Sequence, residues 1–188
     1  MLLIGLLAVG ALWPQVGGFD GKGMAYRLPV FAFPALIVPA LRWRRRNGSY
    51  PWALDAGLTL PFLFDTAANG VGLYDSVTAT DDVLHALNWL VLFAGVTADL
   101  ARHAMGAPRW LTWVAGAGMG AAAIIFWEVA EYAIMRAGVG GLSLTYADTL
   151  GDLVLSTLGG AVGAWFALRV FGSGPAAQAP AQKPERDT

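Results

Sequence analysis

The sequence contains no cysteine among its 188 residues, and only 13% of its residues are charged. The absence of cysteine excludes disulfides, zinc sites built from thiolates and a thiol nucleophile. The net charge of −1 gives no indication of a nucleic-acid partner, and no basic stripe alternates with aromatic residues. Phosphate-binding loops, dinucleotide fingerprints and nucleophile elbows are missing as well. We therefore expect no nucleic acid among the partners of this protein.

Apolar residues are abundant instead. They make up 56% of the chain, and the mean hydropathy of +0.54 lies outside the range of soluble domains. Residues 110–127 form a run of 18 residues without a charge, close to the roughly 20 residues that cross the hydrocarbon layer of a bilayer. Further mostly apolar stretches cover residues 25–41, 51–73 and 83–101, which contain one or two charged residues each, and residues 153–168, which contain none. This pattern predicts an all-α, polytopic membrane protein.

The first apolar run, LLIGLLAVGALW, is only 12 residues long and stops before Pro14. A signal-peptide core is an alternative, although the basic n-region and the A-x-A cleavage site are missing. If the run is a short first span, the chain forms a six-helix transmembrane bundle over residues 1–172. The Pro, Ala and Gln content of residues 173–188 is typical of a disordered segment, which we expect to be a cytoplasmic tail.

Lysine and arginine residues predict the orientation of the bundle. Nine of the twelve basic residues fall on one side if the chain alternates through six spans: Arg42, Arg44, Arg45, Arg46, Arg102, Arg109, Arg169, Lys183 and Arg186. Only Lys22, Arg27 and Arg136 fall on the other side. Because basic residues are concentrated on the cytoplasmic side of membrane proteins, we expect both termini in the cytoplasm and a multi-pass location in the cell inner membrane.

Acidic residues show the opposite bias. Nine of the thirteen lie in outer loops or in the outer halves of spans: Asp20, Asp65, Asp75, Asp81, Asp82, Glu128, Glu131, Asp148 and Asp152. Glu128 is 19 residues beyond Arg109, or about 28 Å at the helical rise, and Asp152 is 17 residues before Arg169, or about 25 Å. His85 enters its own span within the first turn. The helices are therefore predicted to place these side chains in one outer layer.

Spacing predicts that the polar residues of each span share one helix face, because residues three or four positions apart are neighbours on a helix. Four spans carry such sets: Asp65 and Asn69; Asp81, His85 and Asn88; Glu128 and Glu131; and Asp148 and Asp152. Too few basic residues lie on this side for arginine to neutralise all of these carboxylates. A bound cation, shared protons or exposure to the aqueous interface would each offset the repulsion.

Simpler explanations apply to some of these residues. Asp75, Asp82 or Asp148 can lie in headgroup water, and an aspartate early in a helix, such as Asp148 or Asp152, complements the helix dipole.

Other features of the sequence indicate packing or boundaries. Asp99 and His103, four positions apart, are predicted to mark a solvated helix end. Ser156 has no adjacent base by spacing. Gly159 and Gly163 form a small-xxx-small pattern, which lets two membrane helices approach closely.

Four elements carry a resemblance to a known family: Tyr74-Asp75, Asp81-x-x-x-His85, Trp127-Glu128-x-x-Glu131 and the stretch ADTLGDLVLSTLGG from position 147. Over about residues 65–165 the chain resembles the YjdF-like family of small bacterial inner-membrane proteins. A second resemblance, to VanZ-like membrane proteins, rests on the same two glutamates, on Asp148 and Asp152, and on the glycine-rich final helix. Both resemblances imply a membrane fold with a polar site, and neither implies an established reaction.

Three classes of function remain open. The first is a membrane enzyme that hydrolyses a lipid-linked or envelope substrate at the outer leaflet, with Mg, Mn or Ca favoured over Zn or Fe as its divalent metal ion. Its predicted metal ligands are His85, Glu128, Asp148 and Asp152, and Glu131 or Asp81 is the predicted general base. The second is a cation- or proton-coupled transporter that uses the same carboxylates. The third is an accessory subunit without catalysis. The lipid bilayer is the one partner that follows directly, whereas the substrate and the oligomeric state stay open.

Overall fold

The computed structural model describes residues 1–44, 48–104, 106–138 and 144–171. All regular secondary structure within these ranges is helical: α1 (Leu2–Leu12), α2 (Met24–Arg44), α3 (Trp52–Gly70), α4 (Leu73–Ser76), α5 (Thr80–His103), α6 (Arg109–Arg136) and α7 (Tyr146–Val170). The predicted all-α class is therefore confirmed for this part of the chain. The predicted disordered tail, residues 173–188, lies outside the described residues.

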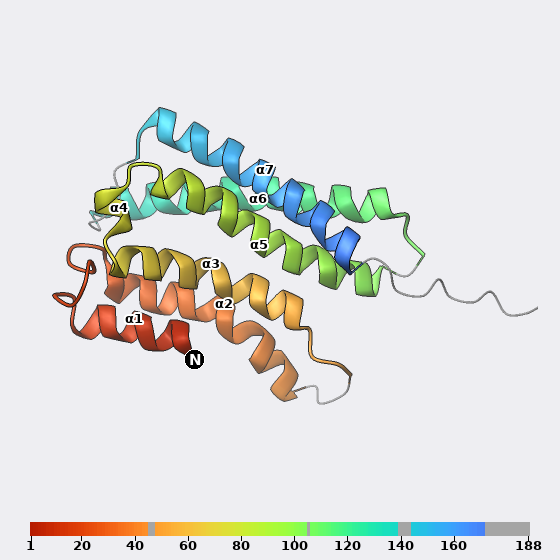
Figure 1. The fold of residues 1–188 in the computed structure, drawn as a ribbon, viewed down its shortest axis with the longest axis horizontal. Helices are drawn as coiled ribbons and strands as arrows, with labels where there is room; N and C mark the ends of the chain where they lie inside the picture. Colours follow the sequence, from red (N-terminus) through yellow and green to blue (C-terminus); the bar gives the residue numbers. More distant parts are fainter. Residues whose placement is uncertain (45–47, 105, 139–143, 172–188) are drawn as a thin grey trace, which may run out of the picture.

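The helices form two groups that meet along α3 and α5 (Figure 1). In the first group α1 and α2 pack on each other and on α3, and in the second α5, α6 and α7 pack together. The C-terminal ends of α2, α5 and α7 and the N-terminal end of α6 lie at one end of the bundle. We call this the basic end, because its described basic residues are Arg42, Arg44, Arg102, Arg109 and Arg169. The segregation of basic residues predicted from the sequence is thus present in the fold.

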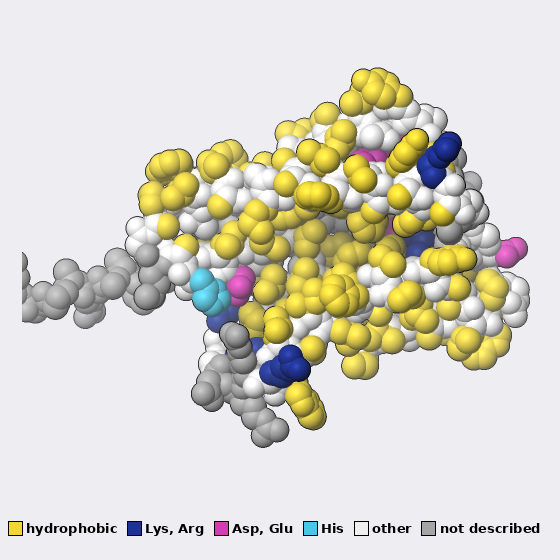
Figure 2. Space-filling model, turned by 180° about the vertical axis from the view of Figure 1, so that it is seen from behind, with side chains coloured by type: hydrophobic (Ala, Val, Ile, Leu, Met, Phe, Trp, Pro, Cys, Tyr) yellow, Lys and Arg dark blue, Asp and Glu magenta, His cyan; other side chains and the backbone are white. Residues whose placement is uncertain are grey.

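Among the described residues, four helices are long and apolar enough to cross a membrane: α2, α5, α6 and α7. Large hydrophobic side chains remain exposed along them, and hydrophobic side chains cover most of the rear face of the molecule (Figure 2). Lipid is the solvent in which such a surface is stable. The chain is therefore a multi-pass membrane protein.

The two other predicted spans do not meet the same criteria. Helix α1 has 11 residues, or about 16 Å of helix, which is about half of the hydrocarbon thickness. Helix α3 has 19 residues but carries Asp55, Asp65 and Asn69, and it packs between α2 and α5. The count of six spans and the cytoplasmic location of both termini therefore stay predictions.

Two glycines bring α7 into backbone contact with α5. A Cβ atom added at Gly159 would lie 2.2 Å from the carbonyl oxygen of Ala86, and one added at Gly163 would lie 2.1 Å from that of Leu90. Such distances are accessible only without a side chain, as the small-xxx-small pattern predicted. This contact holds the first turns of α5 and α7 side by side, which is where both helices carry their acidic residues.

One tryptophan connects the two helix groups. The ring centroid of Trp127 on α6 lies 6.3 Å from that of Phe31 on α2, 6.3 Å from that of Phe62 on α3 and 6.2 Å from that of Trp89 on α5. Aromatic pairs at such separations add to the stabilisation that apolar burial provides. Because Glu128 follows Trp127 directly, this packing also fixes the position of the glutamate.

Substitution of Gly163 by alanine tests the close contact. We expect Gly163→Ala to destabilise the protein by about 1–3 kcal/mol, because the new methyl group would collide with the Leu90 carbonyl group. Gly118→Ala on α6 is the matched control, since a Cβ atom there meets nothing within 4 Å. Thermal unfolding in detergent measures both variants, and equal melting temperatures would contradict the packing described.

Candidate metal centre

Five ionisable side chains gather at the end of the bundle opposite the basic end. Asp81 and His85 come from the first two turns of α5, Glu128 and Glu131 from the C-terminal part of α6, and Asp152 from the second turn of α7. The helix directions bring these segments together, because α5 and α7 begin at the end where α6 finishes (Figure 1). We call these five residues the acidic cluster.

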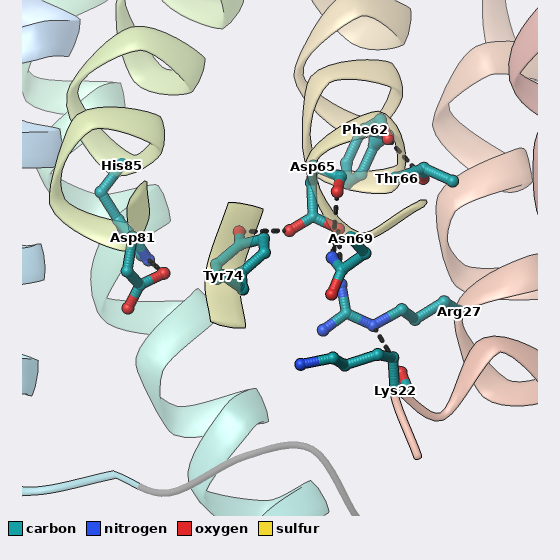
Figure 3. Close-up of polar contacts among 9 residues, drawn as sticks. All are labelled: Lys22, Arg27, Phe62, Asp65, Thr66, Asn69, Tyr74, Asp81 and His85. Carbon is teal, nitrogen blue, oxygen red and sulfur yellow. Dashed lines mark hydrogen bonds and ion pairs between the residues drawn. The ribbon is translucent and has the colours of Figure 1, made fainter. Parts of the chain in front are cut away.

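His85 lies at the centre of the acidic cluster. Its Nε2 atom is 3.8 Å from Oδ1 of Asp81 and 3.7 Å from Oδ1 of Asp152. Asp81 and His85 point toward each other in Figure 3. Both separations exceed a hydrogen-bond length, so the carboxylate oxygens surround the nitrogen without binding it directly.

Two overlapping groups of potential ligand atoms share His85. One group is Asp81, His85 and Asp152, and the other is His85, Glu128 and Glu131. In each group one ligand atom per residue lies within 4.8 Å of the others. Atoms that bind one metal ion at about 2.0–2.5 Å lie roughly this far apart or closer. Helices α5 and α7 supply the first group, α5 and α6 supply the second, and His85 on α5 belongs to both.

The second ring nitrogen of His85 is occupied. Nδ1 lies 3.0 Å from the Ser156 hydroxyl oxygen on α7, and the imidazole stacks on Trp89 with 5.9 Å between ring centroids. If Nδ1 carries the proton and donates it to Ser156, the lone pair of Nε2 faces the carboxylates and is free to bind a metal. Sequence reasoning missed this role of Ser156. A signal was present, since Ser156 follows Asp152 by four residues and so shares its helix face.

Two carboxylates of the cluster are buried without partners. Glu128 is 6% exposed, and neither of its oxygens has a hydrogen-bond partner within bonding distance, although the Thr149 side chain is near. Asp152 is 2% exposed, and its Oδ1 atom also lacks a partner. Unpaired buried carboxylates cost several kcal/mol. A nearby positive charge or a bound proton must therefore offset the cost of burying Glu128 and Asp152.

The helix dipoles offset only part of this charge. Asp81 and Asp148 lie in first turns, where a negative charge is favoured. Asp152 lies one turn further into α7, beyond the range of this effect. Glu128 and Glu131 gain nothing from the dipole of α6, because its negative end lies on their side. The dipole of α7 therefore stabilises the negative charge of Asp148 but not that of Asp152.

Basic side chains do not neutralise the cluster either. Among the ion pairs of the described residues, none joins a lysine or arginine to a member of the acidic cluster. Two of the basic residues at this end bind other carboxylates, and a third, Arg136, is exposed at the last turn of α6. Arg27 binds Asp65 at 2.5 Å, and Lys22 binds Asp75 at 2.6 Å.

A separate polar network surrounds Asp65, as Figure 3 shows. Besides Arg27, the Tyr74 hydroxyl donates to Asp65 Oδ1 at 2.6 Å and the Asn69 side-chain amide donates to Oδ2 at 3.3 Å. Burial raises the pKa of the Tyr74 phenol above its ordinary value, and the neighbouring negative charge of Asp65 raises it further. The sequence had predicted Asp65 and Asn69 as part of one acidic layer. The structure shows that Arg27 and Tyr74 bind Asp65 within that layer, whereas its common depth with the acidic cluster stays a prediction.

Five of the six predicted site residues lie in the acidic cluster, and one lies outside it. His85, Glu128 and Asp152, predicted as metal ligands, lie together with Glu131 and Asp81, predicted as general bases. Asp148 belongs to neither group of donors: it is half-buried, and its backbone N–H donates to the Thr145 hydroxyl group at the start of α7. The roles assigned to all six residues stay predictions.

Helices of membrane length, a lipid-compatible surface and a buried cluster of carboxylates around one histidine define a multi-pass membrane protein with a buried polar cluster. The chain belongs to the family described as "Predicted membrane protein (DUF2238)", whose model matches residues 1–173. This result confirms the YjdF-like resemblance seen in the sequence. No curated protein and no solved structure gives a significant match.

Removal of the buried charge at Glu128 tests its unpaired state. Without added metal, Glu128→Gln is expected to melt at the same temperature as the wild type or higher, because the variant replaces a buried carboxylate with a neutral amide of the same shape. Asp65→Asn is the matched control. It removes a carboxylate that Arg27 and Tyr74 bind, so we expect a loss of about 2–3 kcal/mol. If Glu128→Gln lost as much stability as Asp65→Asn, Glu128 would have a partner within the protein.

Proposed function

We propose that this membrane protein binds one divalent cation in the acidic cluster. The unpartnered oxygens of Glu128 and Asp152 support the proposal most directly, because they are buried and because each residue belongs to one of the two donor groups that share His85. A cation would supply the positive charge that the described basic residues do not. The proposed ligands are His85, Glu128 and Asp152, completed by Asp81 or Glu131.

The donor set favours a hard cation that accepts one imidazole nitrogen. Carboxylate oxygens suit Mg²⁺, Ca²⁺ and Mn²⁺, and imidazole binds transition metals. Mn²⁺ combines both preferences and is the ion we favour. Asp81 is 43% exposed, so the cluster has an aqueous approach on that side, while Asp152 closes it on the other.

Hydrolysis is the reaction class that this arrangement favours. A cation lowers the pKa of a bound water, and a carboxylate next to it accepts the proton. Glu131 and Asp81 would act as that base, since each is less buried than Glu128 or Asp152. The water oxygen would bond to the carbon or phosphorus of the substrate, the bond from that atom to the leaving oxygen would break, and the leaving oxygen would take the proton from the carboxylic acid. A substrate anchored in lipid would reach the cluster from the membrane, which makes a lipid-linked or envelope compound the proposed substrate class.

One observation favours transport as a second candidate. The two groups of donors overlap at His85 but extend to different helices, toward Asp81 and Asp152 or toward Glu128 and Glu131. A cation that exchanges between the two groups would pass from ligands of α5 and α7 to ligands of α6, and stepwise exchange of carboxylate ligands is a property of ion pathways in membranes. Ion-dependent uptake into proteoliposomes, abolished in Glu128→Gln, would support this candidate over hydrolysis.

Titration with Mn²⁺ tests the metal site without knowledge of the substrate. The free aqueous ion has a sharp electron paramagnetic resonance spectrum, which loses intensity on binding. We expect about one bound Mn²⁺ per chain and an affinity at least about tenfold lower in His85→Gln, because a tenfold loss corresponds to only about 1.4 kcal/mol. His103→Gln is the matched control: His103 also follows an aspartate by four residues, but its side chain is 74% exposed at the basic end.

The outcomes are distinct. Equal Mn²⁺ affinities of the wild type and His85→Gln would refute His85 as a ligand. If well-folded wild-type protein bound no Mn²⁺, the metal site would be refuted and a role as an accessory subunit would be favoured. Loss of binding in both histidine variants would indicate a general effect on the protein rather than a site at His85.

Ser156→Ala tests the orientation of His85. The variant removes the hydroxyl group that fixes Nδ1, so we expect Mn²⁺ affinity to fall by about 10–100-fold while the protein remains folded. Ser156→Thr keeps a hydroxyl group and should retain more of the affinity. An unchanged affinity in Ser156→Ala would show that Ser156 does not position the ligand.

A further inference from the structure

A groove at the basic end of the bundle lies far from the acidic cluster. It has a volume of about 420 Å³ and is formed by α6 and α7, with these lining residues: Arg109, Trp110, Trp113, Trp165, Leu168 and Arg169. The lining is unusual in composition, because two arginines and three tryptophans supply five of its six residues. Neither helix alone provides the set, so the groove exists only where the start of α6 packs on the end of α7.

The two arginines of the groove are held in place but not neutralised. The Arg109 guanidinium donates to the carbonyl oxygen of Leu168, and the Arg169 guanidinium lies 5.2 Å from the centroid of the Trp165 ring. Neither side chain forms an ion pair with a carboxylate within the described part of the chain. Two fixed positive charges therefore face the groove, and an anion would satisfy both.

The tryptophans make the deeper wall of the groove apolar. Trp113 is one turn further into α6 than Arg109, and Trp165 is one turn before Arg169 on α7. The Trp113 indole N–H donates to the Ala161 carbonyl oxygen at 3.0 Å, so its polar atom is already satisfied and its ring presents apolar surface. The charge thus lies at the edge of the bundle and the apolar wall lies toward its centre.

We propose that this groove binds an anionic phospholipid. Its phosphate would lie between Arg109 and Arg169, and an acyl chain would extend along Trp113, Trp165 and Leu168. The order of charge and apolar surface along the groove matches the order of headgroup and tail in a lipid whose headgroup is at the membrane surface. Basic residues next to membrane helices attract anionic headgroups, and tryptophans are typical of this interfacial region. The site is independent of the proposed metal site.

Alternative ligands fit the groove less well. A free inorganic anion would use the two arginines but leave the tryptophan wall unoccupied. A neutral phospholipid would use the wall but leave a net positive charge at its headgroup. Only a molecule with both an anionic head and an apolar tail uses every lining residue, and in a membrane such molecules surround the protein.

Thermal stabilisation by added lipid tests the proposal. Wild-type protein in a neutral detergent is titrated with phosphatidylglycerol, with phosphatidylcholine of the same acyl chains, and with inorganic phosphate. We expect saturable stabilisation by phosphatidylglycerol at a concentration at least about fivefold below that of phosphatidylcholine, and none by inorganic phosphate in the same range. Equal effects of the two lipids, or full stabilisation by inorganic phosphate, would overturn the proposal.

Substitution of Arg169 locates the effect. Arg169→Gln is expected to weaken the response to phosphatidylglycerol by about fivefold and leave the response to phosphatidylcholine unchanged. Arg102→Gln is the matched control, because Arg102 lies at the same end on α5 but donates to the Ser49 hydroxyl group outside the groove. Arg169 is the preferred position, since Arg109 also holds a backbone carbonyl and its loss can disturb the fold. An unchanged response in Arg169→Gln, or an equal loss in Arg102→Gln, would refute this site.

Discussion

Buried negative charge without a lysine or arginine partner is the constraint on which this structure depends. Glu128 and Asp152 are almost inaccessible to solvent and have oxygens without hydrogen-bond partners, and both lie in helices that are apolar enough to cross a membrane. A carboxylate in such surroundings is unstable unless a proton or a cation accompanies it. No ion pair among the described residues joins a lysine or arginine to these carboxylates, and His85 belongs to both groups of potential ligands. A bound cation accounts for all of these features together.

The remainder of the fold keeps this arrangement in register. Backbone contact at Gly159 and Gly163 aligns the first turns of α5 and α7, and the packing of Trp127 against both helix groups fixes the glutamates of α6. At the opposite end, α6 and α7 carry two arginines and three tryptophans that line one groove. One three-helix unit therefore presents two distinct polar surfaces, one suited to a cation and the other to an anionic headgroup.

The sequence predicted much of this arrangement because helical spacing and depth are simple functions of residue number. The positions of His85, Glu128 and Asp152 follow from counting along three spans, and the structure brings them together. Pairings between helices are harder to foresee, because they depend on rotation and tilt. The sequence therefore did not predict that Arg27 and Tyr74 bind Asp65, or that Ser156 holds His85. The number of spans does not follow from hydropathy alone, because α1 is too short and α3 is more polar than the other long helices.

The most direct test of the account is an experimental structure determined with Mn²⁺, in which anomalous scattering locates the metal. The account predicts one anomalous peak within coordination distance of His85 Nε2 and of oxygens from Glu128 and Asp152. The peak should disappear in Glu128→Gln. Density that places the ion elsewhere, or a well-ordered cluster whose carboxylates point away from His85 and toward lipid, would contradict it.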